Sequence, residues 1–237
     1  SVCAKISGEI AEIHGNKGFK GELNIKFIGA AGQSFGAFLL QGMNIKLVGE
    51  ANDYVCKGMN GGILSIIPEK IDINSSNQVI LGNTCLYGAT GGKLYALGKS
   101  GERFAVRNSG ATAVVEGAGD HCCEYMTGGH VTVLGQVGLN FGAGMTGGFA
   151  YVLDEDRTFF DKCNRGLVNL ERITTEEMQP HRKHLKEILE RHFKYTKSIK
   201  AKELLNDFEK FESYFWLVIP AASNIQDLLK ATTANAA

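Results

Sequence analysis

The chain has 237 residues, 44% of them hydrophobic, and its 25 Lys and Arg residues balance its 25 Asp and Glu residues. This length supports a substantial core, in one elongated domain or two compact ones. The balanced charge gives no electrostatic footprint for nucleic acid or an anionic membrane, and no apolar run approaches the ~20 residues of a membrane span. We therefore expect a protein that binds neither nucleic acid nor membrane.

The chain begins with Ser1 and carries no signal-peptide pattern. We expect a processed product or an excised domain, located in the cytoplasm, or in the plastid stroma if the source is a photosynthetic eukaryote. Glycine is over-represented, with 30 residues against three prolines. Such an excess is typical of turns that need positive φ or close backbone approach.

The initial segment, residues 1 to about 30, is predicted to form alternating strands. Within Gly21 to Gly29, the apolar residues Leu23, Ile25 and Phe27 share one face of an extended chain.

Stacked repeats are predicted from there to about Asp154. Four segments align without gaps around a twin glycine followed by an apolar run that ends in two apolar residues and a turn residue: Gly58 to Pro68, Gly88 to Gly98, Tyr125 to Gly135 and Gly144 to Asp154. Similar endings give strand exits at Gly29, Gly49, Pro68, Gly82, Gly98, Glu116, Gly135 and Asp154. Each repeat is predicted to contain a strand and its exit.

Units of 14 to 20 residues cannot bury an apolar face alone, so they must stack on their neighbours. A unit this short holds two or three short strands and no helix of ordinary length. The repeats therefore predict an all-β fold, a single-stranded parallel β-helix of about seven coils spaced at ~4.8 Å.

Glycine nearly disappears after Asp156 and helix formers replace it. Residues 155–173 are predicted to close the open end of the stack, since an uncapped β-helix exposes core and strand edges. We predict two units, a β-helix with its closing segment over residues 1–173 and a helical tail over residues 174–237. The tail is expected to pack on the β-helix or on partner domains.

The tail is read as helix, helix, strand and short helix. Thr174 and Glu177 form a predicted capping box for a helix to about Tyr195, and a second helix is predicted from about Ser198 to Tyr214. FWLVIP, ending at Pro220, is predicted to be an extended strand. Ser223 and Gln226 are predicted to cap a final short helix, and ATTANAA is predicted to fray.

Cysteines fall mostly at matching coil positions. Cys85 and Cys122 share one ladder with Val55 and Phe141, and Cys56 and Cys123 share the next with Leu86. We interpret them as buried reduced thiols that act as small hydrophobes. A metal or iron–sulfur site is the alternative, which the spacing does not support.

Acidic ladder positions provide a test for a carbohydrate-cleaving site. Asp53, Asn83, Asp120 and Leu139 each stand nine residues before the second glycine. Two carboxylates several coils apart exceed the separations that glycoside hydrolysis uses. We predict that these side chains bond backbone amides instead.

Histidines and basic residues concentrate in the first tail helix. His181 and His184 are three residues apart and His192 follows, but no carboxylate or cysteine completes a zinc set nearby. The basic residues between Arg182 and Lys202 outnumber the acidic ones eight to two, which predicts a solvated helix face or a docking site for an acidic surface.

Glycines in GLNFGAGMTGG match G-x-G-x-x-G at Gly142, Gly144 and Gly147, but a strand rather than a helix is predicted next, which excludes a dinucleotide-binding motif. We interpret the twin glycines as structural turn residues: Gly61, Gly62, Gly91, Gly92, Gly128, Gly129, Gly147 and Gly148. No catalytic, cofactor-binding or metal-ligating residue is predicted.

The stretches RNSGATAVVEGAGDHCCEYMTGGHVTVLG and VGLNFGAGMTGGFAYVLD resemble the C-terminal glycine-repeat domain of the glutamate synthase large subunit, known as the GXGXG domain. The resemblance begins near SGEIA and GNKGF, continues through AGQSFGAFL and ANDYVCKGMNGG, and reaches RGLVNLERI and the tail. It implies a right-handed β-helix.

This resemblance also implies a noncatalytic scaffold. In that family an amidotransferase domain releases ammonia from glutamine, and a synthase domain with FMN and an iron–sulfur cluster builds glutamate from 2-oxoglutarate. No motif for their nucleophile, flavin site or cluster ligands is found here, so these domains are expected as partners and no cofactor is expected in this chain. YFWLVIP is similar to ferredoxin-dependent members, yet ferredoxin and an NADPH-dependent small subunit both remain possible donors.

Two other functions are alternatives. One is a β-helix subunit of a metal enzyme similar to formylmethanofuran dehydrogenase, a family with similar glycine repeats. The other is a carbohydrate-active β-helix enzyme, which would need a groove lined with carboxylates and aromatic residues.

Overall fold

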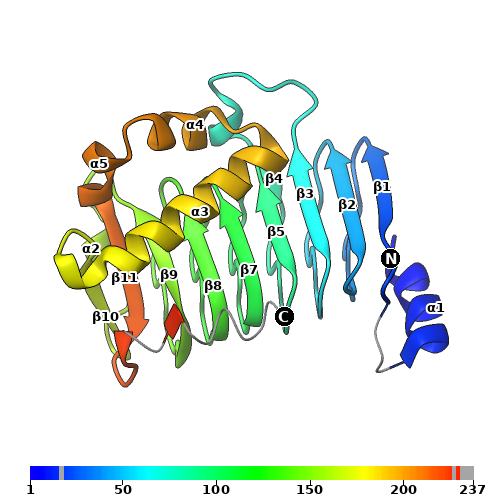
Figure 1. Cartoon of the computed structure of the whole chain (residues 1–237), viewed down its shortest axis with the longest axis horizontal. Coiled ribbons are helices and arrows are strands. Elements are labelled where there is room, and N and C mark those ends of the chain that lie inside the picture. Colours follow the sequence, from blue (N-terminus) through cyan, green and yellow to red (C-terminus); the bar gives the residue numbers. More distant parts are fainter. Residues whose placement is uncertain (16–18, 226–227, 230–237) are drawn as a thin grey trace.

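The computed structural model describes residues 1–15, 19–225 and 228–229. Seven parallel strands, one from each coil, form most of a nine-stranded sheet (Figure 1). They are β1 (Leu23–Ile28), β2 (Met43–Val48), β3 (Ile63–Ile67), β5 (Lys93–Ala96), β7 (Ser109–Val115), β8 (Thr127–Val133) and β9 (Gly147–Leu153). The predicted all-β fold, a β-helix of about seven coils with a helical tail, is confirmed.

Alternate strand residues point to the two sides of this sheet, as the two-residue period requires. Inward residues such as Ile45, Leu64 and Val131 build the core of the coils. Outward residues such as Tyr95, Val114 and Tyr151 join a second cluster, which they share with the tail. The division at residue 173 therefore stays a prediction, because tail and coils share packed side chains.

One predicted strand exit, at Gly82, belongs to a strand outside the repeated sheet. Leu81 and Gly82 end β4 (Val79–Leu81), which pairs with β6 (Lys99–Ser100) in a separate two-stranded sheet, so that coil is longer than predicted. It also carries the 3-10 turn η2 (Ser75–Asn77). The predicted exit at Glu116 is confirmed, because β7 ends at Val115 and the chain bends at Glu116. Two apolar residues followed by a turn residue therefore mark the end of a strand in either sheet.

A ladder of left-handed residues runs along the coils. In six coils, three residues spaced by two have φ between 52° and 72°: Ser34, Gly36, Phe38; Tyr54, Cys56, Gly58; Thr84, Leu86, Gly88; Arg103, Ala105, Arg107; His121, Cys123, Tyr125; and Asn140, Gly142, Gly144. Their amides bond carbonyls of adjacent coils, for example Ser34 N to Asp53 O at 2.8 Å and Cys56 N to Phe35 O at 3.0 Å. Stacking bonds therefore hold non-glycine residues in a conformation that glycine favours.

The N-terminal residues form a helix, α1 (Ala4–His14), so the prediction of strands throughout residues 1–30 is wrong. Ile6 and Ile10 lie one helical turn apart and pack against the coil core. Ser7 is buried between them, and its hydroxyl donates to Cys3 O at 3.1 Å. Burial of this helical stripe overrides the low helix propensity of Ser and Gly.

The C-terminal end of the stack is closed by two further strands. β11 (Phe215–Pro220), which is the predicted FWLVIP strand, lies antiparallel between β9 and β10 (Val168–Arg172). The short helix α2 (Phe159–Lys162) places Phe159 edge-on to Phe141 of the last coil, with ring centroids 5.1 Å apart. Residues 155–173 thus contribute to the predicted closure, together with β11.

The long helix α3 (Gln179–Thr196) crosses the outer face of the sheet from β11 to β5 (Figure 1). It starts at Gln179, after the turn η3 (Glu176–Met178), and no side chain caps it, so the predicted Thr174 capping box is wrong. Pro180 in its first turn fixes the helical φ instead.

The predicted second helix is divided into α4 (Ile199–Asn206), α5 (Phe208–Phe211) and η4 (Glu212–Tyr214). Asp207, with φ of −139°, interrupts it. Ser198 caps α4 by accepting a hydrogen bond from the Ala201 amide at 2.9 Å. In the predicted final helix, the described residues Ile225, Leu228 and Leu229 are helical, whereas Gln226 and all of ATTANAA lie outside the described residues.

Candidate functional site

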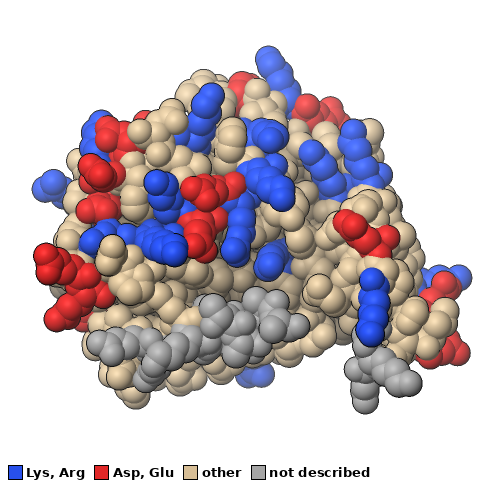
Figure 2. Space-filling view, viewed as in Figure 1, with Lys and Arg blue, Asp and Glu red and all other residues tan. Residues whose placement is uncertain are grey.

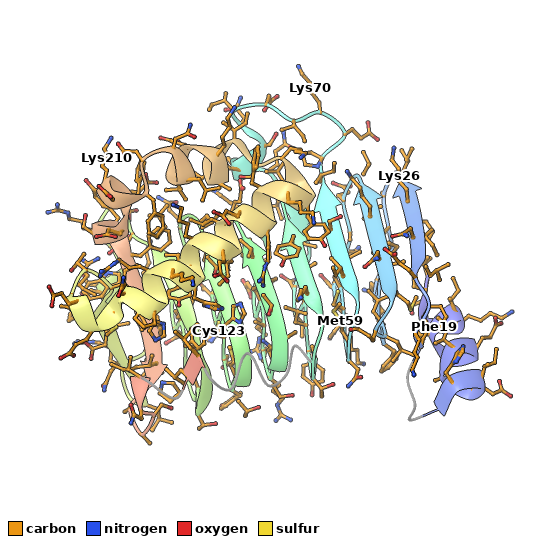
Figure 3. The ribbon with its side chains drawn as sticks, in the orientation of Figure 1. Phe19, Lys26, Met59, Lys70, Cys123 and Lys210 are labelled. Carbon is orange, nitrogen blue, oxygen red and sulfur yellow. The ribbon has the colours of Figure 1, made fainter. Side chains whose placement is uncertain are left out.

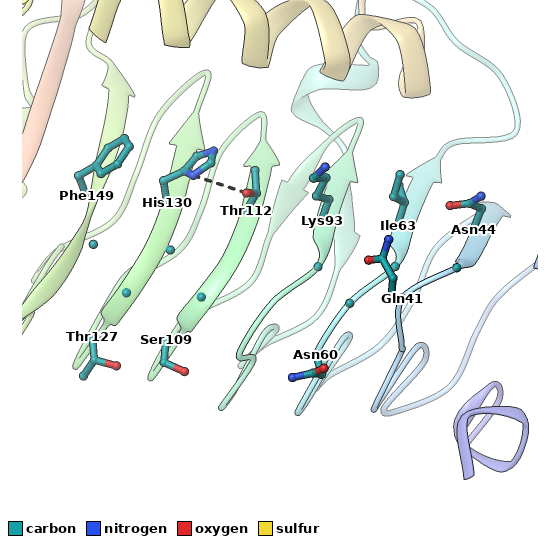
Figure 4. Close-up of a pocket in the computed structure, with 18 of the residues that line it drawn as sticks. Gln41, Asn44, Asn60, Ile63, Lys93, Ser109, Thr112, Thr127, His130 and Phe149 are labelled. Carbon is teal, nitrogen blue, oxygen red and sulfur yellow. Dashed lines mark hydrogen bonds between the residues drawn. The ribbon is translucent and has the colours of Figure 1, made fainter. Parts of the chain in front are cut away.

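A groove of about 730 Å³ runs across the starts of the strands, and glycine backbone forms its floor (Figure 4). Six of the eight predicted turn glycines line it: Gly61, Gly62, Gly92, Gly128, Gly129 and Gly148. Gly91 and Gly147 are the first members of their pairs and are not among the lining residues. The sequence repeat therefore places most of its glycines along one surface feature.

The two members of each twin have different backbone constraints. The second members, Gly62, Gly92, Gly129 and Gly148, have φ between 71° and 87°. At the first members, Gly61, Gly91, Gly128 and Gly147, an added Cβ would lie 2.1–2.5 Å from a backbone atom of the preceding coil. The proposed role of these residues in close coil stacking stays a prediction that substitutions can test.

Polar side chains border the glycine floor on both sides. Figure 4 shows Asn60, Ser109 and Thr127 along one edge, and Lys93 and His130 along the other. The one carboxylate in the lining, on Glu22, accepts a hydrogen bond from the Asn44 amide at 2.8 Å. This groove has polar donors and backbone, and its lining does not present the carboxylate pair that glycoside hydrolysis requires.

His130 belongs to a cluster of rings between the sheet and α3. Its ring stacks on Phe149, with centroids 5.4 Å apart, and meets His184 edge-on at 4.8 Å. The Tyr151 hydroxyl lies 2.8 Å from His181 Nδ1 and 3.2 Å from His184 Nδ1. Burial lowers the pKa of His130 well below its ordinary value and that of His184 to about 4. These imidazoles are therefore neutral near pH 7.

The three tail histidines do not converge on one point. His181 and His184 share the Tyr151 hydroxyl, whereas His192 Nε2 lies 3.1 Å from Glu116 Oε1. Within residues 1–15, 19–225 and 228–229, no group of three or more His, Cys, Asp or Glu side chains is arranged to hold a metal ion.

A buried polar cluster around Glu116 was not predicted from the sequence. Glu116 Oε1 accepts hydrogen bonds from Ser198 Oγ and His192 Nε2, and all three residues are buried. A nucleophilic triad needs the imidazole between hydroxyl and carboxylate. Here the carboxylate stands in the middle, so the cluster attaches the tail to the sheet and does not activate Ser198.

The acidic ladder bonds backbone amides, as predicted. Asp53 Oδ1 accepts from Asn83 N at 2.7 Å, Asn83 Oδ1 from Glu102 N at 2.8 Å, and Asp120 Oδ1 from Leu139 N at 2.7 Å. Each bond joins one coil to the next. These side chains link coils and do not form a catalytic pair.

All six cysteines are free and buried, which confirms their reading as core residues. Cys122 Sγ and Cys123 Sγ lie 3.8 Å apart, and burial raises the pKa of Cys85 and of Cys163 to about 12. A thiol must ionise to act as a nucleophile. The two thiols are therefore inert near neutral pH.

Comparison with known proteins identifies the family. The family model described as "GXGXG motif" matches residues 1–221. The chain belongs to the GXGXG family. Within the left-handed ladder of this chain, Gly142 and Gly144 are two glycines spaced by two residues. The spacing of two between left-handed residues can be seen in the sequence only where glycines occupy those positions.

Among characterised relatives, the chain is similar to ferredoxin-dependent glutamate synthases. It is 55% identical over 93% of its length to the chloroplastic/mitochondrial enzyme 1 of Arabidopsis thaliana, and 54% identical over 96% to the enzyme of Pyropia yezoensis. It is 53% identical over 93% to enzyme 2 of Synechocystis sp.. The chain spans only 13–15% of the length of these relatives.

No helix among the described residues is both long enough and apolar enough to cross a membrane.

Proposed function

We propose that this chain is a noncatalytic scaffold domain of a glutamate synthase, the enzyme that forms glutamate from glutamine and 2-oxoglutarate. The observation that carries the proposal is the similarity of nearly the whole chain to one segment of ferredoxin-dependent glutamate synthases. The same relatives favour this function over a formylmethanofuran dehydrogenase-like subunit or a carbohydrate-active enzyme.

The fold suits such a role because its core is continuous along the coils. The parallel sheet bonds each coil to the next, the left-handed ladder runs through six of the coils, and Asx side chains link three pairs of coils. Displacing one coil would break bonds to both neighbours. We infer that the stack keeps an amidotransferase domain and an FMN and iron–sulfur synthase domain in register.

The cofactors and the electron donor belong to those partner domains in this proposal. The names of the relatives favour ferredoxin over an NADPH-dependent small subunit. Several relatives are named chloroplastic, which supports the plastid stroma as a location alongside the cytoplasm.

The proposal is tested with the purified chain and with the intact enzyme that contains it. The chain alone is expected to show no glutaminase and no glutamate synthase turnover. In the intact enzyme, Gly128→Ala would press a Cβ to 2.2 Å from Ser109 O and distort the stack. We expect glutamine hydrolysis to continue while the yield of glutamate per glutamine hydrolysed falls.

Gly32→Ala is the matched control, because no atom lies within 4 Å of the added Cβ and its φ is outside the left-handed region. Turnover by the purified chain would refute the noncatalytic role. Thermal melting shows whether Gly128→Ala weakens the β-helix. If it does, and the yield of glutamate per glutamine hydrolysed stays unchanged, the scaffold role is refuted.

A further inference from the structure

The N-terminal end of the coil stack presents an unpaired strand edge. Among the strands that the structure describes, β1 pairs only with β2. The amides of Leu23 and Gly29 donate to carbonyls on the β2 side, at 2.8 and 2.9 Å. Backbone amides alternate between the two edges of a strand. The amides of Asn24, Lys26 and Ile28 therefore point to the free edge of β1, away from β2. Such an edge is a template for another extended chain.

The inward face of this end is incompletely covered. Leu23, Ile25 and Phe27 remain half-buried, whereas their register partners Met43, Ile45 and Leu47 in the next coil are at most 2% exposed. Helix α1 covers part of the core through Ile6 and Ile10. A further strand on β1 would complete the burial of this apolar row.

The outward face of the same end is basic. Lys26 stands directly opposite Lys46 in the strand register, and like charges at such positions repel. Both lie on a shallow groove of about 390 Å³ whose lining includes Lys194 and Tyr195 of α3 and no Asp or Glu. Figure 3 shows Lys26 at the free end of the sheet, pointing away from β1, and Figure 2 shows basic side chains over the upper part of this end, with acidic ones below them.

Neither lysine has a carboxylate partner among the described residues. Ile28, one position along the same outward row, is 72% exposed. The end of the stack therefore combines free backbone groups, an unfinished apolar row and uncompensated positive charge.

We propose that β1 is a docking edge for an extended, acidic protein segment of the surrounding assembly, which pairs with β1 as an added strand. Its carboxylate faces Lys26 and Lys46, and its alternate apolar side chains cover Leu23, Ile25 and Phe27. This inference rests on the proposed scaffold function and names the chemistry of one contact that the scaffold makes.

Other occupants fit less well. Two copies of this chain joined edge to edge through β1 would bring their Lys26 side chains together. A head-to-tail contact would leave a new open end on every copy and would not close. A polyphosphate backbone matches the lysines, but it supplies neither strand hydrogen bonds nor apolar side chains.

The test uses the assembly purified from the organism that encodes this chain. Carbodiimide, which joins an amine directly to a nearby carboxylate, is applied and the products are mapped by mass spectrometry. We expect Lys26 or Lys46 to be linked to an Asp or Glu outside residues 1–237. Links only to Glu22, to a second copy of this chain, or to nothing would overturn the proposal.

Amide hydrogen exchange provides the second readout. The amides of Asn24, Lys26 and Ile28 should exchange at least 10-fold more slowly in the assembly than in the isolated chain. Lys26→Glu should remove that protection, whereas Lys57→Glu, at an exposed lysine of another coil surface, should leave it unchanged. Equal exchange in assembly and isolated chain, or protection lost on nuclease treatment, would contradict strand pairing.

These outcomes are independent of the scaffold test. Loss of coupling in Gly128→Ala enzyme without protection at β1 would retain the scaffold and reject this contact. Protection at β1 together with full coupling in Gly128→Ala enzyme would support this contact and reject the scaffold.

Discussion

The two ends of the coil stack are finished in different ways. At the C-terminal end, β11 inserts between β9 and β10, and Phe215, Leu217 and Val218 are fully buried. At the N-terminal end, β1 has one neighbour among the described strands and a half-buried inward row. The same coil geometry thus closes itself at one end only, which indicates that the other end is available to a partner.

The closed end depends on contacts that the coils alone cannot supply. The indole Nε1 of Trp216 donates to Asp154 Oδ2 at 2.9 Å, and the Arg172 guanidinium lies 3.4 Å from the centre of the Trp216 ring. Asp154 Oδ1 also accepts from the Thr158 and Phe159 amides. One carboxylate at the last strand exit therefore ties the closing segment to β11.

The largest effect is expected where the tail is attached to the sheet. Glu116→Ala removes the acceptor shared by His192 and Ser198 and should lower the free energy of unfolding by about 3–5 kcal/mol. Denaturant unfolding measures it. Glu155→Ala, which breaks the exposed pair with Lys200, is the control and should cost at most about 1 kcal/mol. Equal costs would show that the buried cluster does not anchor the tail.

A pair of truncations compares the ends directly. Leu217→Ala at the closed end should lower the free energy of unfolding by about 3 kcal/mol, because the site is fully buried. Ile25→Ala at the open end removes less buried surface and should cost about 1 kcal/mol. Chemical denaturation of both variants gives the difference, and a larger loss for Ile25→Ala would reverse the comparison.

Between the two ends, helix α3 covers the sheet, and the stability of this region should depend on pH. Burial holds the pKa of His184 at about 4 in the fold, below its ordinary value near 6.5, so the unfolded chain binds the proton more readily. Stability from this group is full above about pH 6.5 and is lost as pH falls toward 4, by roughly 2–3 kcal/mol in total.

His130 and His181 have lowered pKa values for the same reason and add to the slope. Thermal melts between pH 7.5 and 4.5 follow this loss. His184→Gln should flatten the pH dependence while Lys183→Gln, at an exposed neighbour, should not. An unchanged slope in His184→Gln would show that this imidazole titrates normally.

The smallest predicted difference in stability is between alanine substitutions at Gly138 and Gly32, which occupy the same position in two coils. Gly138→Ala would place a Cβ 2.0 Å from Asp120 Oδ1 on the preceding coil and should cost about 2 kcal/mol. Gly32 holds the matching position in the first coil, where an added Cβ meets no atom within 4 Å, so Gly32→Ala should change stability by less than about 0.5 kcal/mol. Similar melting temperatures for both variants would contradict the stacking argument.

Much of the fold was predictable because the coils repeat their chemistry. The twin glycines and the apolar runs after them located β3, β5, β8 and β9, and the cysteine positions identified core rows. The left-handed ladder was hidden because 13 of its 18 positions hold residues other than glycine, and inter-coil bonds, not local preference, impose their conformation.

The remaining errors have the same origin in contacts distant along the chain. The buried contacts of Glu116 had no sequence signal because its partners His192 and Ser198 lie far along the chain. The helix α1 contains Ser7 and Gly8, which disfavour helix, and it forms because Ile6 and Ile10 pack against the coil core. The bare edge of β1 has no sequence signal apart from Lys26, whose repeat partner Lys46 becomes meaningful only in register.

Native-state hydrogen exchange on the isolated chain tests the difference between the ends most directly. We predict that the amides of Leu217 and Val218 exchange only through global unfolding. The amides of Ile25 and Phe27 should exchange through local opening of β1, with protection at least 100-fold lower. Equal protection at both ends, with a single opening energy for β1 and β11, would contradict the account of one closed and one open end.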